Sequence, residues 1–349
     1  MDKALIAMSG GVDSSVAAFL MIRSGFGCIG ATMRLWENEH ARDSIGDAKS
    51  IARRLGMDFH VIDYTQDFRE KVVDAFIHSY EIGDTPNPCI RCNRHLKFDA
   101  LLHDAIKLGC QYLATGHYAK VCYDPGSGRH LLYKATDATK DQSYFLSSLT
   151  QEQLSHTKFP LGELTKEQVR QIAGEQGFLN ARKKDSQDIC FIPDGDYMEF
   201  ITRYTGKSYP SGRFLDQEGN TVGQHCGAVR YTIGQRKGLG LAMGEPVYVC
   251  SKDMESNTVT VGPDAALYKS ALIAKDWNGI AIPAVTNPLR VSAKIRYRHT
   301  PQPATVFPEE GGNVRIVFDQ PQRAITPGQA VVLYDNDLVI GSGTITSAY

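Results

Sequence analysis

The sequence predicts an α/β fold in which a doubly wound parallel sheet is followed by a small β-rich central domain and a C-terminal β-barrel. Three observations support this fold class. Short apolar runs alternate with helical patterns over the first third of the chain, and a turn rich in glycine and serine directly follows the first apolar run. After about residue 205, glycine and proline separate short runs of alternating polarity, as in antiparallel sheets. We expect domains at residues 1–204, 205–267 and 268–349.

The first domain is expected to contain parallel strands joined by helices. Its buried strands are predicted where apolar runs are bounded by glycine or polar turns, at residues 5–8, 28–33, 59–63 and 112–115. The spacing of apolar residues predicts helices at residues 14–24, 42–55, 67–81 and 94–108. A further helix over 166–176 is predicted by a capping box of Thr165 and Gln168, with Gly177 beyond its end.

The composition is that of an ordinary globular protein in a reducing compartment. The chain has 349 residues, of which 42% are hydrophobic and 22% charged, and no apolar run approaches the roughly 18 residues that span a bilayer. We therefore expect no signal peptide, no membrane anchor and no membrane partner. Eight cysteines in such a chain predict reduced thiols and a cytoplasmic location. Because the formal net charge is only -1, nucleic-acid binding would depend on local basic patches.

The strongest functional signal lies between the first predicted strand and the first predicted helix, in Ser9-Gly10-Gly11-Val12-Asp13-Ser14-Ser15. Glycines allow backbone amides to close around phosphate oxygens, serines add hydroxyl donors, and the helix N-terminus attracts an anion. A Walker A loop would end in lysine followed by serine or threonine, and this segment has no lysine. The segment instead resembles the pyrophosphatase loop of enzymes that cut ATP between its α- and β-phosphates and transfer AMP to a substrate oxygen. The alternative is a polar turn in which Asp13 only caps the helix.

An ATP site at this loop would draw on the carboxyl ends of neighbouring strands, where ligands bind in doubly wound sheets. The predicted nucleotide-binding residues are Ala7, Met8, Ser9, Gly10, Gly11, Val12, Asp13, Ser14, Met33 and Gly116. Asp13 is also expected to help hold Mg²⁺. Met33 would contact adenine or belong to the core, and Gly116 would let the backbone approach the nucleotide. His117 is either a solvated loop residue or a contact to RNA or substrate.

A second signal is a pair of cysteines before the fourth predicted helix, in Thr85-Pro86-Asn87-Pro88-Cys89-Ile90-Arg91-Cys92-Asn93. We expect Arg91, Arg94 and Lys97 to lower the pKa of a nearby thiol, which would make it a nucleophile at neutral pH. A zinc knuckle or a redox pair uses the same spacing, but no second cysteine pair completes a four-thiolate zinc site. Cys190 lies in a separate apolar run, which by itself is typical of a buried structural cysteine.

Six segments together, in order and over nearly the whole chain, resemble the bacterial tRNA-specific 2-thiouridylase family. They are residues 9–15, Thr85 to Asn93, Ala114 to Tyr118, Lys140 to Tyr144, Cys190 to Ile192, and Thr326 to Gln329. The resemblance implies a catalytic domain of the pyrophosphatase-loop, adenine nucleotide alpha hydrolase-like type over 1–204 and a tRNA-binding barrel over 268–349. It also implies ATP-dependent thiolation at C2 of the wobble uridine in tRNAs for lysine, glutamate and glutamine. Sulfur would come from a cysteine desulfurase, directly or through a relay protein.

The resemblance also assigns roles to individual residues. Cys92 matches the nucleophile and Cys190 matches the cysteine that carries the persulfide, and with Asp13 they form the predicted catalytic set. The segment that touches the target base is matched by Asn87, Pro88 and Cys89. The other matched tRNA contacts are His117, Lys140, Asp141, Gln142, Arg296, Tyr297 and Gln329. The first-described family members carry aspartate where this chain has Cys89, so this third thiol is either spare or, with Cys92 and Cys190, a ligand of an iron–sulfur cluster.

The chemistry of uridine agrees with this assignment. Its C2 oxygen is a poor leaving group, so AMP transfer would make departure feasible and a sulfur nucleophile would then attack C2. Basic clusters offer an RNA surface; they are Arg53-Arg54, Arg91-Arg94-Lys97, Arg182-Lys183-Lys184, Arg230-Arg236-Lys237 and Lys294-Arg296-Arg298. Two alternatives remain: an amidating or ligating enzyme of the argininosuccinate or lysidine type, which needs no paired cysteines, and a nonenzymatic RNA-binding protein with a metal knuckle.

Overall fold

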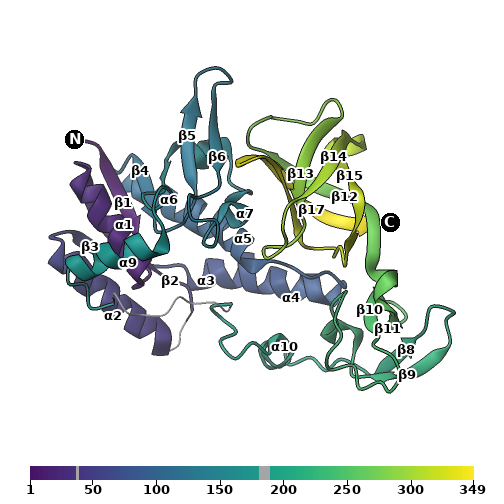
Figure 1. The fold of residues 1–349 in the computed structure, drawn as a ribbon. Coiled ribbons are helices and arrows are strands. Elements are labelled where there is room, and N and C mark those ends of the chain that lie inside the picture. Colours follow the sequence, from purple (N-terminus) through teal and green to yellow (C-terminus); the bar gives the residue numbers. More distant parts are fainter. Residues whose placement is uncertain (37–38, 181–188) are drawn as a thin grey trace.

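The structure is a computed structural model that describes residues 1–36, 39–180 and 189–349. An α/β unit formed by the first half of the chain lies at one side, and a β-barrel formed by the C-terminal residues lies at the other (Figure 1). A small four-stranded sheet lies beyond the barrel, at the far end of a long helix that leaves the α/β unit (Figure 1). No helix in the described ranges combines the length and the apolar character that crossing a membrane requires.

The α/β unit is built on a parallel sheet, as predicted. Its strands are β1 (Lys3–Ala7), β2 (Gly27–Arg34), β3 (Asp58–Asp63), β4 (Tyr112–Thr115) and the short β7 (Thr157–Lys158). The order β3-β2-β1-β4-β7 places β1 between β2 and β4, and all these pairings are parallel. The strand order therefore reverses at β1, and the loops after β1 and β4 meet at this switch point.

Alternate residues of the strands face two separate cores, because successive side chains of a strand point to opposite faces of the sheet. Ala4 and Ile6 of β1 belong to a core that also contains residues of α1 (Val12–Arg23), α2 (Glu39–Arg54) and α9 (Lys166–Glu175). Leu5 belongs to the other core, with the helices that follow β3. The capping box of Thr165 and Gln168 at the start of α9 is confirmed.

The two other long helices depart from the predicted bounds. The first is continuous from α3 (Thr65–Phe68) through a π-helical segment (Arg69–Val73) into α4 (Asp74–Glu81). The second begins earlier than predicted, with α5 (Pro88–Cys92), and continues through a π-helical segment (Asn93–Ala100) into α6 (Leu101–Lys107). The earlier start follows from Asn87, whose side chain caps the helix, and from Pro88 at the first helical position. Both cysteines of the pair therefore lie on a helix and not in a preceding loop.

Several short elements were not predicted. They are the hairpin of β5 (Lys120–Asp124) and β6 (Arg129–Tyr133), the helices α7 (Ser143–Leu146) and α8 (Gln151–Ser155), and α10 (Tyr197–Thr205). The hairpin lies between the α/β unit and the barrel (Figure 1), and Tyr133 of β6 pairs with Leu338 of the barrel. It therefore extends the barrel sheet into the first half of the chain.

The second half of the chain forms two β structures, as its glycine- and proline-punctuated pattern predicted. The smaller sheet contains β8 (Gly212–Leu215), β9 (Thr221–His225), β10 (Tyr248–Asp253) and β11 (Thr258–Gly262) around its own core. The barrel strands are β12 (Tyr268–Gly279), β13 (Leu289–Lys294), β14 (Gln302–Pro308), β15 (Val314–Arg323), β16 (Ala330–Asp335) and β17 (Leu338–Ala348). Because β12 pairs with both β15 and β17, the sheet closes on itself and the predicted barrel is confirmed.

Candidate active site

The loop after β1 has the form of a phosphate-binding turn. The Ser14 hydroxyl donates to the Gly11 carbonyl over 3.0 Å and accepts from the Ser9 amide over 3.2 Å, so the loop is held by its own serines. Gly11 occupies the N-cap of α1, and no side chain caps this end of the helix. The first turn of α1 can therefore offer its backbone amides to an anion.

Asp13 is held by two residues from distant parts of the chain. The Lys166 ammonium donates to its two carboxylate oxygens over 2.7 and 2.8 Å, and the Tyr118 hydroxyl donates to one of them over 2.8 Å. The carboxylate therefore does not cap α1, which removes the alternative of a simple capped turn. Lys166 was predicted only as the start of a helix. Nothing in the local sequence distinguishes it from a solvated lysine.

The segment after β4 packs directly on the phosphate-binding loop. A Cβ atom on Gly116 would lie 2.7 Å from both the Asp13 carbonyl carbon and the Ser14 amide nitrogen, so only glycine allows this approach. Tyr118 is fixed in turn by Gln142, whose side-chain oxygen accepts from the Tyr118 amide over 2.9 Å. The structure thus joins three predicted segments: the loop after β1, residues 116–118 and residues 140–142.

Of the other residues near this loop, some have a structural role in the core, and one that contacts the loop was not predicted. Met33 packs against the hydrophobic core at the end of β2, which agrees with its interpretation as a core methionine. Ala7 is the last residue of β1, and the buried Met8 donates its amide to the Ala31 carbonyl over 2.8 Å. Asn180 was not predicted, yet its amide donates to the Gly10 carbonyl over 3.1 Å and to the Ser15 hydroxyl over 2.9 Å. It closes the far side of the loop.

The three cysteines of interest lie on two elements. Cys89 and Cys92 belong to α5, and Cys190 lies in a turn closed by a hydrogen bond from the Ile192 amide to the Ile189 carbonyl. Cys89 and Cys190 are exposed, so Cys190 is not the buried structural cysteine that its local sequence suggests. All eight cysteines are free thiols.

Burial and the neighbouring thiols both disfavour the thiolate form of these cysteines. Burial, and then the charges of Cys92 and Cys89, raise the pKa of Cys190 to about 12, while Lys97 opposes them. Burial also raises the pKa of Cys92 to about 11, although the charge of Lys97 lowers it. Although Cys190 is exposed as a residue, the protein atoms around its sulfur therefore disfavour the thiolate.

The expected lowering of a thiol pKa is wrong for this state of the protein. Burial of the thiols is the largest cause, and the two arginines bond to backbone carbonyls, Arg91 Nε to Lys71 over 3.1 Å and Arg94 to Ser148 over 3.1 Å. Lys97 is left as the cation that favours the thiolates. Burial outweighs this single charge.

His117 connects the cysteine helix with the phosphate-binding loop. Its Nε2 lies 3.5 Å from Lys97 Nζ, and its Nδ1 lies 2.7 Å from the Thr115 hydroxyl. Its ring centroid lies 5.7 Å from that of Phe98 and 6.1 Å from that of Phe159. Burial, and then the charge of Lys97, lower the pKa of His117 well below its usual value. His117 is therefore a half-buried neutral imidazole and not a solvated loop residue.

The residues matched to tRNA contacts occupy different environments. Pro88 is buried, and the Asn87 side chain accepts from the Cys89 amide over 3.2 Å. Asp141 is buried, and its carboxylate accepts from Ala135 and Ser143 within the protein. Its carboxylate is thus engaged internally, whereas the Tyr297 ring, 4.3 Å from that of Phe145, stays only partly buried on the barrel.

Two further matched residues link separate parts of the molecule. Arg296 donates to the carbonyls of Ile233 and Ala324 over 3.2 and 2.8 Å, and to the Thr326 hydroxyl. Gln329 donates its side-chain amide to the Thr85 carbonyl over 2.7 Å. Among the basic clusters, Arg182, Lys183 and Lys184 lie outside the described residues.

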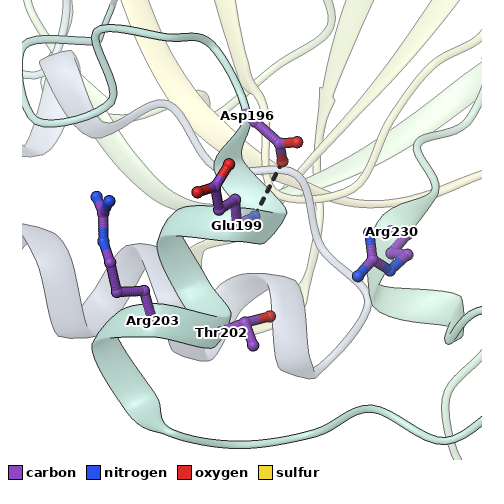
Figure 2. Close-up of a pocket in the computed structure, with 5 residues that line it drawn as sticks. All are labelled: Asp196, Glu199, Thr202, Arg203 and Arg230. Carbon is purple, nitrogen blue, oxygen red and sulfur yellow. Dashed lines mark hydrogen bonds between the residues drawn. The ribbon is translucent and has the colours of Figure 1, made fainter.

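Two hollows of the described surface lie apart from these residues. A hollow of about 420 Å³ is lined by Asp196, Glu199, Thr202, Arg203 and Arg230. Figure 2 shows Asp196 and Glu199 at the start of α10, with Arg230 on a separate segment across from them. A second hollow of about 560 Å³ is lined by Trp36, Arg69, Phe200, Arg203 and Tyr204. Both hollows flank α10 and contain no residue predicted to bind ATP or carry sulfur.

The three thiols do not form a ready metal site. Within residues 1–36, 39–180 and 189–349, no three His, Cys, Asp or Glu side chains are arranged to hold a metal ion. In this arrangement Cys89, Cys92 and Cys190 therefore do not fit an iron–sulfur cluster. Asp13 fits Mg²⁺ better, because a carboxylate beside a phosphate-binding loop is a hard oxygen ligand.

Comparison with known sequences matches nearly the whole chain to three domain families. Residues 2–194 match the profile described as tRNA methyl transferase HUP domain, residues 198–263 match the tRNA methyl transferase PRC-barrel domain, and residues 269–345 match the Aminomethyltransferase beta-barrel domain. The tRNA-specific 2-thiouridylase MnmA of Clostridioides difficile is 47% identical over 352 residues, which cover 98% of each chain. The corresponding protein of Moorella thermoacetica is 48% identical over 353 residues, covering 98% of this chain and 99% of the relative.

Solved structures show a more distant likeness. The U34-tRNA thiolase NcsA from Methanococcus maripaludis, solved with its 4Fe-4S cluster, superposes with a TM-score of 0.36 and 19% identity, over 58% of this chain and 66% of that chain. A 4-thiouridine synthetase in complex with RNA and ATP superposes with a TM-score of 0.37 and 16% identity, over 59% of this chain and 50% of that chain.

Proposed function

The chain belongs to the tRNA-specific 2-thiouridylase family, and from this premise we propose that it replaces the C2 oxygen of the wobble uridine with sulfur at the expense of ATP. One observation carries the proposal. The phosphate-binding loop contacts residues 116–118, and these contact the helix of Cys89 and Cys92 through His117 and Lys97. A nucleotide at the loop and a sulfur atom at the cysteines would therefore lie on two sides of one short segment.

The first step is activation of the uridine. The backbone amides at the start of α1 would hold the phosphates of ATP, with Ser9 and Ser14 adding hydroxyl groups. Mg²⁺, if bound through Asp13, would neutralise charge on the phosphate oxygens. Attack of the C2 oxygen on the α-phosphate then releases pyrophosphate and leaves AMP on the base. Lys166, which pairs with Asp13 beside the loop, would then turn to the phosphates.

The second step is sulfur transfer from a persulfide on Cys190. Its terminal sulfur attacks C2, and the thiolate of Cys92 then attacks the Cys190 sulfur and breaks the bond between the two sulfur atoms. AMP leaves with the former C2 oxygen, the C2–sulfur double bond forms, and a disulfide of Cys92 and Cys190 remains. The sulfane sulfur has gained two electrons and the thiols have lost two, so an external reductant must reopen the disulfide. Because two cysteines suffice, Cys89 has no role in this route.

The substrate and the partners follow from the same family. We propose that tRNA for lysine, glutamate or glutamine binds across the α/β unit and the barrel, and that a cysteine desulfurase or a relay protein supplies the persulfide sulfur to Cys190. The exposure of Cys190 supports such a delivery, because a donor protein must reach it. Reduced thiols and a tRNA substrate favour the cytoplasm as the compartment.

The direct test is mass spectrometry of nucleosides from tRNA incubated with the protein, ATP and a sulfur donor. We expect 2-thiouridine derivatives at the wobble position, and loss of tRNA-dependent AMP release in Asp13→Ala and Ser14→Ala. Undiminished AMP release by both variants would remove the loop from the reaction. If Cys92→Ser still modified tRNA without adding sulfur, a ligating enzyme would be favoured. If the protein consumed no ATP in the presence of tRNA, a nonenzymatic RNA-binding protein would be favoured.

A further inference from the structure

A turn of the barrel forms hydrogen bonds to the chain just before the cysteine helix. The Thr85 amide donates to the Pro327 carbonyl over 2.9 Å, and the Thr85 carbonyl accepts from the Gln329 side chain over 2.7 Å. Both backbone polar groups of Thr85 are therefore bound by one turn that lies more than two hundred residues away in the sequence. Two hydrogen bonds on opposite sides of one residue fix its orientation as well as its position.

The backbones of the two segments touch, because the middle of the turn is a glycine. A Cβ atom on Gly328 would lie 2.8 Å from the Asp84 Cβ and 2.8 Å from the Thr85 amide nitrogen. The φ angle of Gly328 is +85°, which also favours glycine. The turn itself is anchored to the barrel wall, where Gly328 donates to Ile345 over 2.9 Å and Ile345 donates to Gln329 over 2.9 Å.

Thr85 is connected to the cysteine helix by a short segment with a restricted backbone. Pro86 follows Thr85, and its ring restricts the backbone φ angle. Asn87 then caps α5 by accepting from the Cys89 amide over 3.2 Å, and Pro88 takes the first helical position. Because this link has little conformational freedom, a shift of Thr85 would also shift Asn87 and the N-terminus of the cysteine helix.

The same turn is tied to the smaller sheet. Thr326 accepts from Arg296, which also bonds to Ala324 of the barrel over 2.8 Å and to Ile233, between η3 (Ala228–Arg230) and β10, over 3.2 Å. Arg296 thus bonds to Thr326 at the start of the turn, while Gln329 at the end of the turn bonds to Thr85.

We infer that the turn Thr326–Pro327–Gly328–Gln329 is a brace that positions residues 85–89 against the target base, and that Gln329 is its main positioning residue. RNA that binds the barrel at this turn would shift Thr85 or restrict its motion. Because Thr85 is linked to the cysteine helix, RNA binding would thereby change the position or mobility of that helix. The coupling to RNA rests on the proposed function, whereas the brace itself is a property of the free protein.

The test compares Gln329→Glu and Gln329→Ala with the unchanged protein. Glutamate keeps the size of the side chain but sets an acceptor against the Thr85 carbonyl, so it should disturb the brace more than alanine does. Gln302→Ala is the matched control, because Gln302 is a half-buried barrel glutamine, like Gln329, whose side-chain amide bonds locally to the Thr300 carbonyl over 3.1 Å.

The readout is hydrogen–deuterium exchange of the amides of residues 84–92 without tRNA or ATP. Loss of one hydrogen bond should speed exchange there by about threefold to tenfold, while β1 and the control variant stay unchanged. Unchanged exchange at 84–92 in both Gln329 variants would overturn the brace, whatever their activity.

A kinetic measurement separates positioning from simple RNA contact. As a positioning residue, Gln329 should affect the single-turnover rate of thiolation more than the affinity for tRNA. A loss confined to tRNA affinity, with exchange at 84–92 unaltered, would make Gln329 an RNA contact only. A brace confirmed by exchange in a protein that never thiolates tRNA would leave the brace standing and remove the proposed function alone.

Discussion

At the scale of single residues, the charge on Asp13 is balanced inside the protein before any nucleotide arrives. Lys166 lies against both carboxylate oxygens, and its side chain is only 11% exposed. Tyr118 adds a third hydrogen bond to the same carboxylate. A bound cation at Asp13 would release the lysine, which could then follow the negative charge to the phosphates. Lys166 is therefore expected to matter for ATP activation.

We predict that Lys166→Ala lowers tRNA-dependent AMP release by about tenfold to one-hundredfold, the range expected for a buried hydrogen bond to a charged group. Lys166→Arg, which keeps the charge, should recover part of the rate. Lys158→Ala is the control, because Lys158 lies over the Tyr112 ring and not at the loop. Equilibrium binding of ATP provides a readout besides activity. Equal affinity and equal AMP release in Lys166→Ala would contradict the prediction.

The three thiols distinguish two routes for sulfur. We predict that Cys92→Ser and Cys190→Ser each stop thiolation while ATP binding survives, because both are needed to release sulfur from the persulfide. Cys89→Ser should be tolerated in this route. Anaerobic purification with iron analysis and visible absorbance would be run beside these assays. A cluster required for activity, together with an inactive Cys89→Ser, would overturn the persulfide route in favour of an iron–sulfur route.

At the scale of elements, Phe191 anchors the turn that carries Cys190. Its ring is 3% exposed and packs with centroid distances of 5.6, 5.4 and 5.1 Å against Phe68, Phe76 and Phe200. These partners come from the helices after β3 and from α10. An exposed thiol is thus attached to a buried aromatic group one residue away, which fixes where Cys190 sits relative to α5.

We predict that Phe191→Ala destabilises the fold by about 3 to 5 kcal/mol through the cavity it leaves, and slows single-turnover thiolation more than tRNA-dependent pyrophosphate release. Phe191→Leu, which fills most of the space, should lose much less of both. Thermal melting establishes which variants remain folded at the assay temperature. A folded Phe191→Ala with normal thiolation would show that the aromatic group does not position Cys190.

At the scale of the whole molecule, the smaller sheet contacts the α/β unit close to the brace. Met254 packs against Gly83, and the buried Lys252 ammonium lies near Asp84 without a hydrogen-bond partner among the described residues. Burial lowers the pKa of Lys252 to about 8, with the charge of Asp84 opposing the shift. The folded state therefore carries a desolvation cost at neutral pH.

This cost predicts a pH dependence of stability. Between pH 8 and 10.5 the unfolded chain holds a proton on Lys252 that the folded chain has lost, so stability rises with pH across this window. The gain should reach up to about 3 kcal/mol at 1.36 kcal/mol for each pKa unit. Lys252→Met should be more stable than the unchanged protein at pH 7, and the difference should shrink by pH 10. Parallel melting curves for the two proteins at both pH values would check this.

Local patterns explain why much of the fold and part of the site were predictable. The strands of the parallel sheet, the capping box of α9 and the phosphate-binding loop each depend on residues within one short window, so periodicity and turn chemistry reveal them. Cys190 was identified through the family resemblance and not through its surroundings, because its apolar neighbours suggested burial. The start of α5 was missed because prolines 86 and 88 suggested a loop, although proline is favoured at a first helical position.

The sequence by itself determined the order of the elements, the class of the nucleotide loop and the family, because these depend on local pattern and on motifs read in order. Only the tertiary structure decided which distant groups meet. Lys166 reaches Asp13 across 153 positions and Gln329 reaches Thr85 across 244, and no local signal marks either pair. The same holds for the thiols, whose raised pKa values result chiefly from burial, while Arg91 and Arg94 bond to backbone carbonyls. Burial and direction are set by packing, which no single window of sequence contains.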